Sequence, residues 1–221
     1  MRRGLVEQEI YNQAMRLFAE RGFAGTNFQD IADAVGLTRP ALYHYVKSKD
    51  ELLARVVAET TQDAAASIRA IGDRTDLDPV QKIREIVRTN VIRQGEHNTR
   101  FQLLLRSEAN LPEQIAHTHF ESRRLVLRSV TAVLQEGIDS GVFRHTDARV
   151  AALGVIGMSN WVGLWFNADH GDDIEAISQQ LADIAVAGVV SGPAQPGRFE
   201  SRSAAIKSIR ATLQQLEDMG D

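Results

Sequence analysis

The chain has 221 residues, 25 Lys/Arg and 29 Asp/Glu for a net charge of −4, a 43% hydrophobic fraction and no cysteine. This length allows one large or two small domains, and the hydrophobic fraction is ordinary for a globular protein. Without cysteine, disulfides, thiolate chemistry and cysteine-based zinc sites are excluded, which suits a cytoplasmic location.

The sequence predicts neither a signal peptide nor a membrane span. Arg2 and Arg3 are followed by the acidic Glu7 and Glu9 instead of an apolar stretch. The most apolar segment, 150–166, has 17 residues and contains three glycines. It is shorter than the roughly 20 residues that cross a bilayer. We therefore expect it to form a buried bundle helix, with no membrane partner.

Apolar residues recur at intervals of three and four, without sustained alternation, which predicts an all-α protein. Thr26 with Gln29, and Ser48 with Glu51, have the spacing of capping boxes that begin helices. The helices are expected at about 5–21, 28–35, 39–46, 49–71, 79–95, 98–108, 112–140, 147–168, 173–190 and 200–218. The last of these is a narrow amphipathic helix that follows a turn-rich linker, 191–197.

The segment 26–53 has the pattern of a helix-turn-helix motif. Ile31 and Val35 give a short helix an apolar face, Gly36 interrupts it, and Thr38 is placed to cap the next helix. That next helix has polar, aromatic and basic side chains, and the second helix of such motifs enters the DNA major groove.

Charge is distributed in a way that permits DNA binding despite the net negative total. Residues 1–50 contain seven Lys/Arg and six Asp/Glu, a net charge of +1, which leaves −5 for the rest. Between Leu37 and Lys49 there are three basic residues and no acid. A locally positive face can bind phosphates, while an acidic body limits nonspecific binding.

The ordered positions of this segment resemble the DNA-binding domain of TetR-type transcriptional regulators over roughly residues 5 to 55. Val46, at a position that is often aromatic in the family, and Pro40, in the first turn of the recognition helix, depart from its pattern. The resemblance implies an N-terminal three-helix domain followed by a helical ligand-binding and dimerisation domain. We expect the boundaries to be 1–48, 49–190, and 191–221 for the linker and C-terminal helix. The family pattern runs through Phe18, Gly22, Phe23, Thr26, Ile31, Ala32, Val35, Gly36, Leu37, Thr38, Leu42, Tyr43, Tyr45, Ser48, Lys49 and Leu52.

The resemblance also assigns the expected DNA contacts, although any one of these residues could instead be a solvated surface residue. Arg39 is the candidate for reading a guanine, because a guanidinium binds guanine O6 and N7 in a bidentate way. His44 could equally contact a base, contact a phosphate or remain solvated. The base-edge candidates are Thr38, Arg39 and His44. The phosphate candidates are Thr26, Tyr43, Lys47 and Lys49, and Gln29 completes the set.

Trp161 and Trp165 are four residues apart and share a helix face, which fits either a core or dimer interface, or the wall of a ligand cavity. Segments 103–114 and 157–166 resemble a subset of TetR-type regulators that sense fatty-acyl or steroid-derived CoA thioesters. This second resemblance implies that Arg106, Arg123 or Arg124 would meet the anionic part of the ligand. The other candidate lining residues are Phe101, Leu104, Leu105, Phe120 and Met158.

These features together predict a homodimeric, ligand-responsive regulator, most simply a repressor, that binds an inverted-repeat operator in double-stranded DNA. Helices about 147–168 and 173–190 would form the dimer interface by resemblance, and a small apolar or acyl-CoA-like effector would release the DNA. No cofactor and no catalytic motif are expected. Two alternatives remain: a DNA-binding protein without effector, and an all-α metal-dependent enzyme or carrier that uses His97, His117, His119, His145 and His170.

Overall fold

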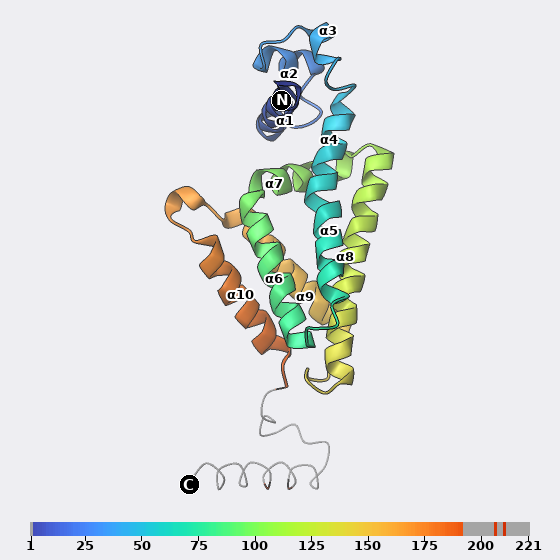
Figure 1. Ribbon diagram of the computed structural model, residues 1–221, viewed down its shortest axis with the longest axis vertical. Coiled ribbons are helices and arrows are strands. Elements are labelled where there is room, and N and C mark those ends of the chain that lie inside the picture. Colours follow the sequence, from blue (N-terminus) through green and yellow to red (C-terminus); the bar gives the residue numbers. More distant parts are fainter. Residues whose placement is uncertain (1, 192–205, 207–209, 211–221) are drawn as a thin grey trace.

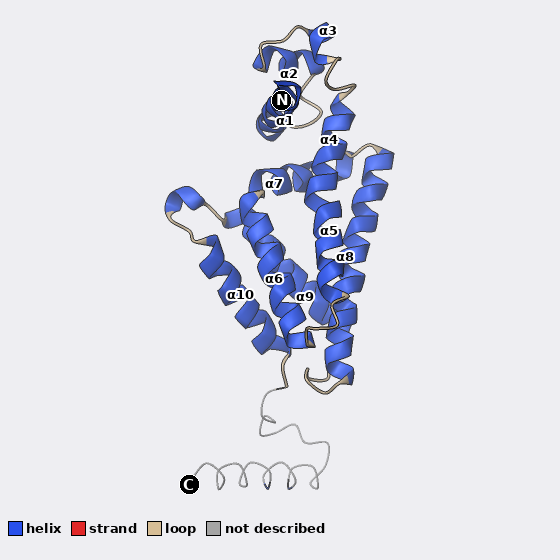
Figure 2. Ribbon diagram, in the orientation of Figure 1, coloured by secondary structure: helices blue, strands red, loops and turns tan. Residues whose placement is uncertain are grey.

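The computed structural model describes residues 2–191, 206 and 210. Its regular secondary structure there is helical, with loops between the helices and one isolated bridge between Phe143 and Val190 (Figures 1 and 2). The predicted all-α fold is confirmed. The predicted helix at 200–218 falls almost entirely outside the described residues. Within them, no helix is both long enough and apolar enough to traverse a lipid bilayer.

The first three helices form a small domain at one end of the molecule (Figure 1). They are α1 (Arg2–Arg21), α2 (Phe28–Ala34) and α3 (Arg39–Leu42). Ile10, Phe18, Ile31 and Leu42 are fully or almost fully buried in their shared core. Leu103, which belongs to the larger domain, packs into the same core. The two domains therefore share buried apolar contacts and are not joined by the connecting helix alone.

The predicted helix 49–71 forms one continuous helical path, but its hydrogen-bonding pattern changes along its length. It consists of α4 (Lys49–Val57), a π-helical segment η1 (Ala58–Gln62) and α5 (Asp63–Gly72). A single π-helical turn inside an α-helix is uncommon and frequently marks a functional site. Here it lies where the helix passes from the small domain into the large one.

The large domain is a bundle in which α6 occupies a central position, packed against α5, α8, α9 and α10. Its core includes the fully buried Ile83, Val87, Val130 and Ala152. At one edge, Arg84 of α6 pairs with Asp183 of α10. The remaining elements are α6 (Pro79–Glu96), α7 (Asn98–Ser107), η2 (Glu108–Asn110), α8 (Glu113–Asp139), α9 (Ala148–Trp165), η3 (Ala168–His170) and α10 (Ile174–Val189).

Candidate DNA-binding surface and central cavity

The loop before α2 corrects one predicted cap and places the Thr26 side chain, a predicted DNA contact, in a buried position. Asn27, and not Thr26, is the N-cap: its side chain accepts from the Asp30 amide at 2.9 Å, and the Asp30 carboxylate accepts from the Asn27 amide at 2.8 Å. The Thr26 side chain is buried, and its hydroxyl lies 3.2 Å from the Leu17 carbonyl and 3.0 Å from that of Gly22. Thr26 therefore ties the loop to α1 through a buried hydroxyl.

The turn between α2 and α3 needs a glycine. Gly36 has a φ of +68°, a conformation that side chains with a Cβ rarely adopt. Thr38 then caps α3, since its hydroxyl accepts from the Ala41 amide at 3.3 Å. The α-helix ends at Leu42 instead of the predicted residue 46, and the amides of His44 and Tyr45 bond carbonyls only three positions back, at Ala41 and Leu42.

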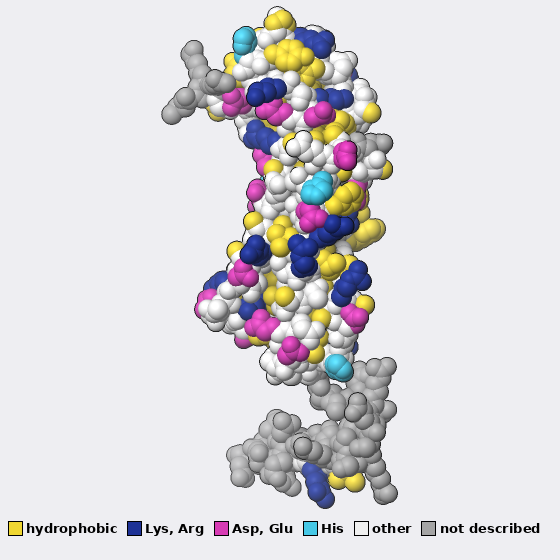
Figure 3. Space-filling model, turned by 90° about the vertical axis from the view of Figure 1, so that its right-hand side faces the viewer, with side chains coloured by type: hydrophobic (Ala, Val, Ile, Leu, Met, Phe, Trp, Pro, Cys, Tyr) yellow, Lys and Arg dark blue, Asp and Glu magenta, His cyan; other side chains and the backbone are white. Residues whose placement is uncertain are grey.

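Exposed polar side chains gather on the outer surface of α3 and of the start of α2. The Arg39 guanidinium lies 6.0 Å from the centre of the Tyr43 ring, and that ring in turn packs on Phe28 at 4.8 Å between centroids. These contacts restrict the directions available to the Arg39 guanidinium. Figure 3 shows basic side chains and a histidine on the far end of this domain. The exposed members of the predicted set are Gln29, Thr38, Arg39, Tyr43, His44 and Lys47.

Lys49 has a structural role that its sequence position did not reveal. Its ammonium donates to the carbonyls of Phe23 and Thr26 at 2.7 and 2.8 Å, and lies 4.3 Å from the Phe23 ring centre. The charge is thereby engaged in joining the start of α4 to the loop after α1. The predicted phosphate contact by Lys49 does not fit this geometry.

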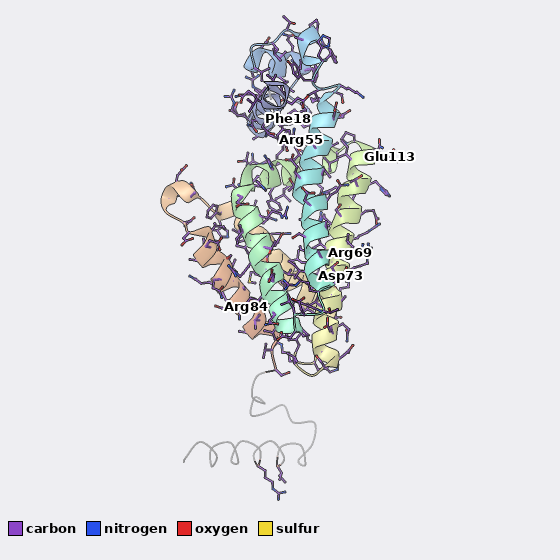
Figure 4. The ribbon with its side chains drawn as sticks, in the orientation of Figure 1. Phe18, Arg55, Arg69, Asp73, Arg84 and Glu113 are labelled. Atoms are coloured by element: carbon purple, nitrogen blue, oxygen red, sulfur yellow. The ribbon has the colours of Figure 1, made fainter. Side chains whose placement is uncertain are left out.

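A polar cluster that sequence reasoning missed joins the small domain to the π-helical segment; we call Tyr11, Arg55, Glu59 and Arg100 the Glu59 junction. The Tyr11 hydroxyl donates to Glu59 at 2.8 Å, and Arg55 donates to the other carboxylate oxygen at 2.8 Å. Arg100 lies 3.1 Å from the same carboxylate. Figure 4 shows Arg55 on α4, where it leaves the small domain.

The junction shifts the ionisation of both Tyr11 and Glu59. Burial and then the hydrogen bond to Glu59 raise the pKa of the Tyr11 phenol. Burial pushes the pKa of Glu59 upward, but hydrogen bonds from Arg55 and Tyr11, together with their charged surroundings, outweigh it. The pKa of Glu59 therefore lies below its ordinary value of 4.5, and the carboxylate is ionised at neutral pH.

Glu59→Gln is expected to lower the free energy of unfolding at pH 7 by about 1–2 kcal/mol, at the low end because Glu59 is only partly buried. A carboxyl whose folded-state pKa is depressed stabilises the fold above its unfolded-state pKa and loses this effect as pH falls through the folded-state value. The stability difference between wild type and variant should therefore be complete well above pH 4.5 and should decrease progressively below it, as pH falls to the folded-state pKa.

Urea unfolding at pH 7 and at a series of acidic pH values measures this difference. Glu20→Gln is the matched control, because Glu20 forms only an exposed ion pair with Arg16 in α1. A Glu59→Gln variant as stable as the control at pH 7 would contradict a stabilising junction.

The large domain contains a cavity of about 630 Å³ that is partly open to solvent, which we call the central cavity. It is bounded by η1, α5, α6, α7, α8 and α9. Five of the predicted lining residues line it: Phe101, Leu104, Leu105, Phe120 and Trp161. Met158 and Trp165 do not. Met158 packs on the buried core, and the Trp165 side chain is 45% exposed on α9.

Polar groups occupy two parts of the cavity wall. Asn160 accepts hydrogen bonds from the amides of Asn90 and Gln94, both at 3.0 Å, so this group is internally satisfied. Arg123 and Arg124 of α8 also line the cavity, whereas Arg106 lines a separate cavity of about 320 Å³ beside α1. The predicted role in binding an anionic ligand therefore fits the position of the α8 arginines and not that of Arg106.

The histidines do not assemble into a metal site within the part of the chain that the structure describes. There, no three His, Cys, Asp or Glu side chains are placed to hold an ion together. His117 is exposed whereas His119, two residues later on α8, is buried, as expected for helical spacing.

Comparison with known families identifies both halves of the molecule. The family described as "Bacterial regulatory proteins, tetR family" matches residues 10–56, and "Tetracyclin repressor-like, C-terminal domain" matches residues 76–189. The chain belongs to the TetR family of transcriptional regulators. As a member of the TetR family it is a DNA-binding regulator of transcription, and the helix-turn-helix prediction is confirmed. This family is not one of enzymes.

Individual relatives of this TetR-family protein span most of its length. The transcriptional repressor KstR2 of Mycobacterium tuberculosis is 26% identical over 183 residues, which cover 82% of this chain and 91% of KstR2. The crystal structure of PfmR from Thermus thermophilus is 27% identical, with a TM-score of 0.72, and covers 80% of this chain and 97% of PfmR. AibR, solved with isovaleryl coenzyme A and operator DNA, shares the fold at 23% identity, a TM-score of 0.66 and coverage of 84% and 98%.

Proposed function

We propose that this TetR-family regulator is a homodimeric repressor that leaves a palindromic operator when a small apolar or CoA-thioester effector fills the central cavity. The observation that carries the proposal is the cavity itself. Its volume of about 630 Å³ lies within the range of small-molecule sites, and its wall is largely apolar. The exposed Arg123 and Arg124 at this wall are suitable for an anionic group such as a CoA phosphate.

Relatives support the repressor and effector parts of this proposal. KstR2 is described as a repressor, and AibR was crystallised with both isovaleryl coenzyme A and operator DNA. In our proposal, residues 1–48 bind DNA, residues 49–190 bind the effector and form the dimer, and 191–221 follow as a separate segment. An effector that prefers one spacing of the two DNA-binding domains shifts the population toward it.

The proposed DNA contacts follow from the exposed surface of α2 and α3. Thr38, Arg39 and His44 would face base edges, while Tyr43 and Lys47 would bind phosphates, with Gln29 beside them. Their support is that they are exposed on the element that such motifs insert in the major groove.

The proposed dimer interface is the exposed apolar surface of α9 and α10. Val150 of α9 is 62% exposed and Ile184 of α10 is 58% exposed. Apolar groups gathered on two adjoining helices are typical of an interface between subunits. Trp165, which is 45% exposed and does not line the central cavity, extends this surface along α9.

Effector binding should lower operator affinity, and operator DNA should lower effector affinity by the same factor, typically about 5- to 150-fold. Trp161 fluorescence, titrated with a panel of acyl-CoAs, steroids and aromatic acids with and without operator, measures both. Trp165→Phe should keep the signal and Trp161→Phe should lose it, because only Trp161 lines the cavity. Unchanged operator affinity with every compound would leave a DNA-binding protein without effector.

A further inference from the structure

Two side chains in the wall of the central cavity have buried polar atoms without hydrogen bonds. They are the Thr60 hydroxyl and both imidazole nitrogens of His119. His119 is only 4% exposed. No other buried side-chain nitrogen or oxygen in the described part of the chain lacks a partner. Native proteins rarely leave such groups unpaired, and a specific unpaired group commonly marks a ligand or a functional role.

The two side chains belong to elements that pack against each other. Thr60 lies in the π-helical segment η1, and His119 lies in the first half of α8, which packs on η1. Among the other polar side chains of the wall, Asn90 and Gln94 donate to the Asn160 side-chain oxygen, and the Thr61 and Ser122 hydroxyls donate to backbone carbonyls. Thr60 and His119 are thus the side chains of this wall whose buried polar atoms have no hydrogen-bond partner in the described part of the chain.

The surroundings of His119 favour a neutral partner group. The Glu108 carboxylate is 3.9 Å from His119 Nε2, too far for a hydrogen bond, and it is already paired with Arg123. Burial lowers the pKa of His119. The charge of Glu108 raises this pKa and that of Arg123 lowers it, and the net result is a ring that is neutral at pH 7. A neutral imidazole offers one donor and one acceptor, and a hydroxyl offers the same. Burying an unpaired anion beside them would be costly.

We propose that Thr60 and His119 form a polar anchor that hydrogen-bonds a neutral carbonyl or hydroxyl group on an otherwise apolar effector. The anchor distinguishes such a molecule from an apolar one of equal shape. This inference rests on the proposed effector cavity. Thr60 also adjoins Glu59, whose carboxylate accepts from Tyr11 of the DNA-binding domain, so a ligand held by Thr60 contacts the segment that holds that domain.

A pair of probes of equal shape tests the anchor directly. 2-Acetylnaphthalene carries a carbonyl where 2-ethylnaphthalene carries a methylene, and equilibrium dialysis gives the affinity of each for the full-length protein. His119→Leu should weaken binding of the ketone about tenfold more than it weakens binding of the hydrocarbon. This factor is the equivalent of one hydrogen bond. Thr60→Val, which removes only the hydroxyl, should act in the same direction. Phe101→Leu is the control, since it should change both affinities alike.

Thermal unfolding separates a binding role from a structural one. Because His119→Leu removes unpaired buried polar atoms, its Tm should rise by about 2–4 °C, whereas a structural histidine would give a decrease. If both probes bind and neither His119→Leu nor Thr60→Val changes the ratio of their affinities, the anchor is overturned and the cavity remains the proposed effector site. Failure of both probes to bind wild type would overturn the anchor together with the proposed effector cavity.

Discussion

Arg39→Ala is expected to weaken operator binding by about 1–3 kcal/mol and to relax the base preference at one position. The Arg39 side chain is exposed at the first residue of α3 and lies over the ring of Tyr43, which packs on Phe28. A guanidinium whose directions are limited in this way loses less entropy when it binds a guanine. Gel-shift titrations against operators substituted at each position measure both the loss and the change of preference.

Lys47→Ala is the matched comparison, because Lys47 is also basic and exposed but offers only a point charge to a phosphate. It should weaken binding to all sequences alike and reduce the slope of log affinity against log salt by about one unit. Equal, sequence-independent losses for Arg39→Ala and Lys47→Ala would refute the separate roles.

The double variant Val150→Glu/Ile184→Glu is expected to convert the protein to a monomer and to reduce operator affinity by roughly 10²–10⁴-fold. Both side chains are about 60% exposed on the proposed interface, so the substitutions leave the fold of each subunit intact. The affinity falls because two half-sites are then bound independently instead of by one linked pair. Light scattering gives the mass, and gel-shift titration gives the affinity.

Val142→Glu serves as the control for this pair, since Val142 is a partly exposed apolar residue in the turn after α8, outside α9 and α10. It should change neither the mass nor the operator affinity. A wild-type protein that is a monodisperse monomer at micromolar concentration and still protects a symmetric site would contradict the dimer.

Helix order could be predicted because each helix has its own local signals. Asp78 caps the helix at Pro79 through a hydrogen bond to the Gln81 amide, as local spacing suggests. The cap of α2 shows the limit of such reasoning. Thr26 with Gln29 and Asn27 with Asp30 both have capping-box spacing, and burial of the Thr26 hydroxyl against α1 selects the second pair.

Features that depend on contacts between distant segments were not predictable. The Glu59 junction joins residues 48 positions apart, and neither Tyr11 nor Glu59 stands out in its local sequence. The π-helical turn at Ala58–Gln62 likewise has no proline or glycine to announce it. Aromatic lining residues could be predicted because large aromatic side chains commonly line small-molecule sites. The helical periodicity of α9 could not distinguish Trp161, which lines the cavity, from Trp165, which does not.

Because the DNA-binding domain is attached to the start of α4, a small tilt of the helical path from α4 to α5 would displace that domain by a larger distance. Lys49 fastens the start of α4 to the loop after α1, and the helical path from Lys49 to Gly72 is about 36 Å long at roughly 1.5 Å per residue. A tilt of about 5° at the lower end would carry the upper end about 3 Å. In the proposed symmetric dimer the two displacements would add to about 6 Å between the two half-sites.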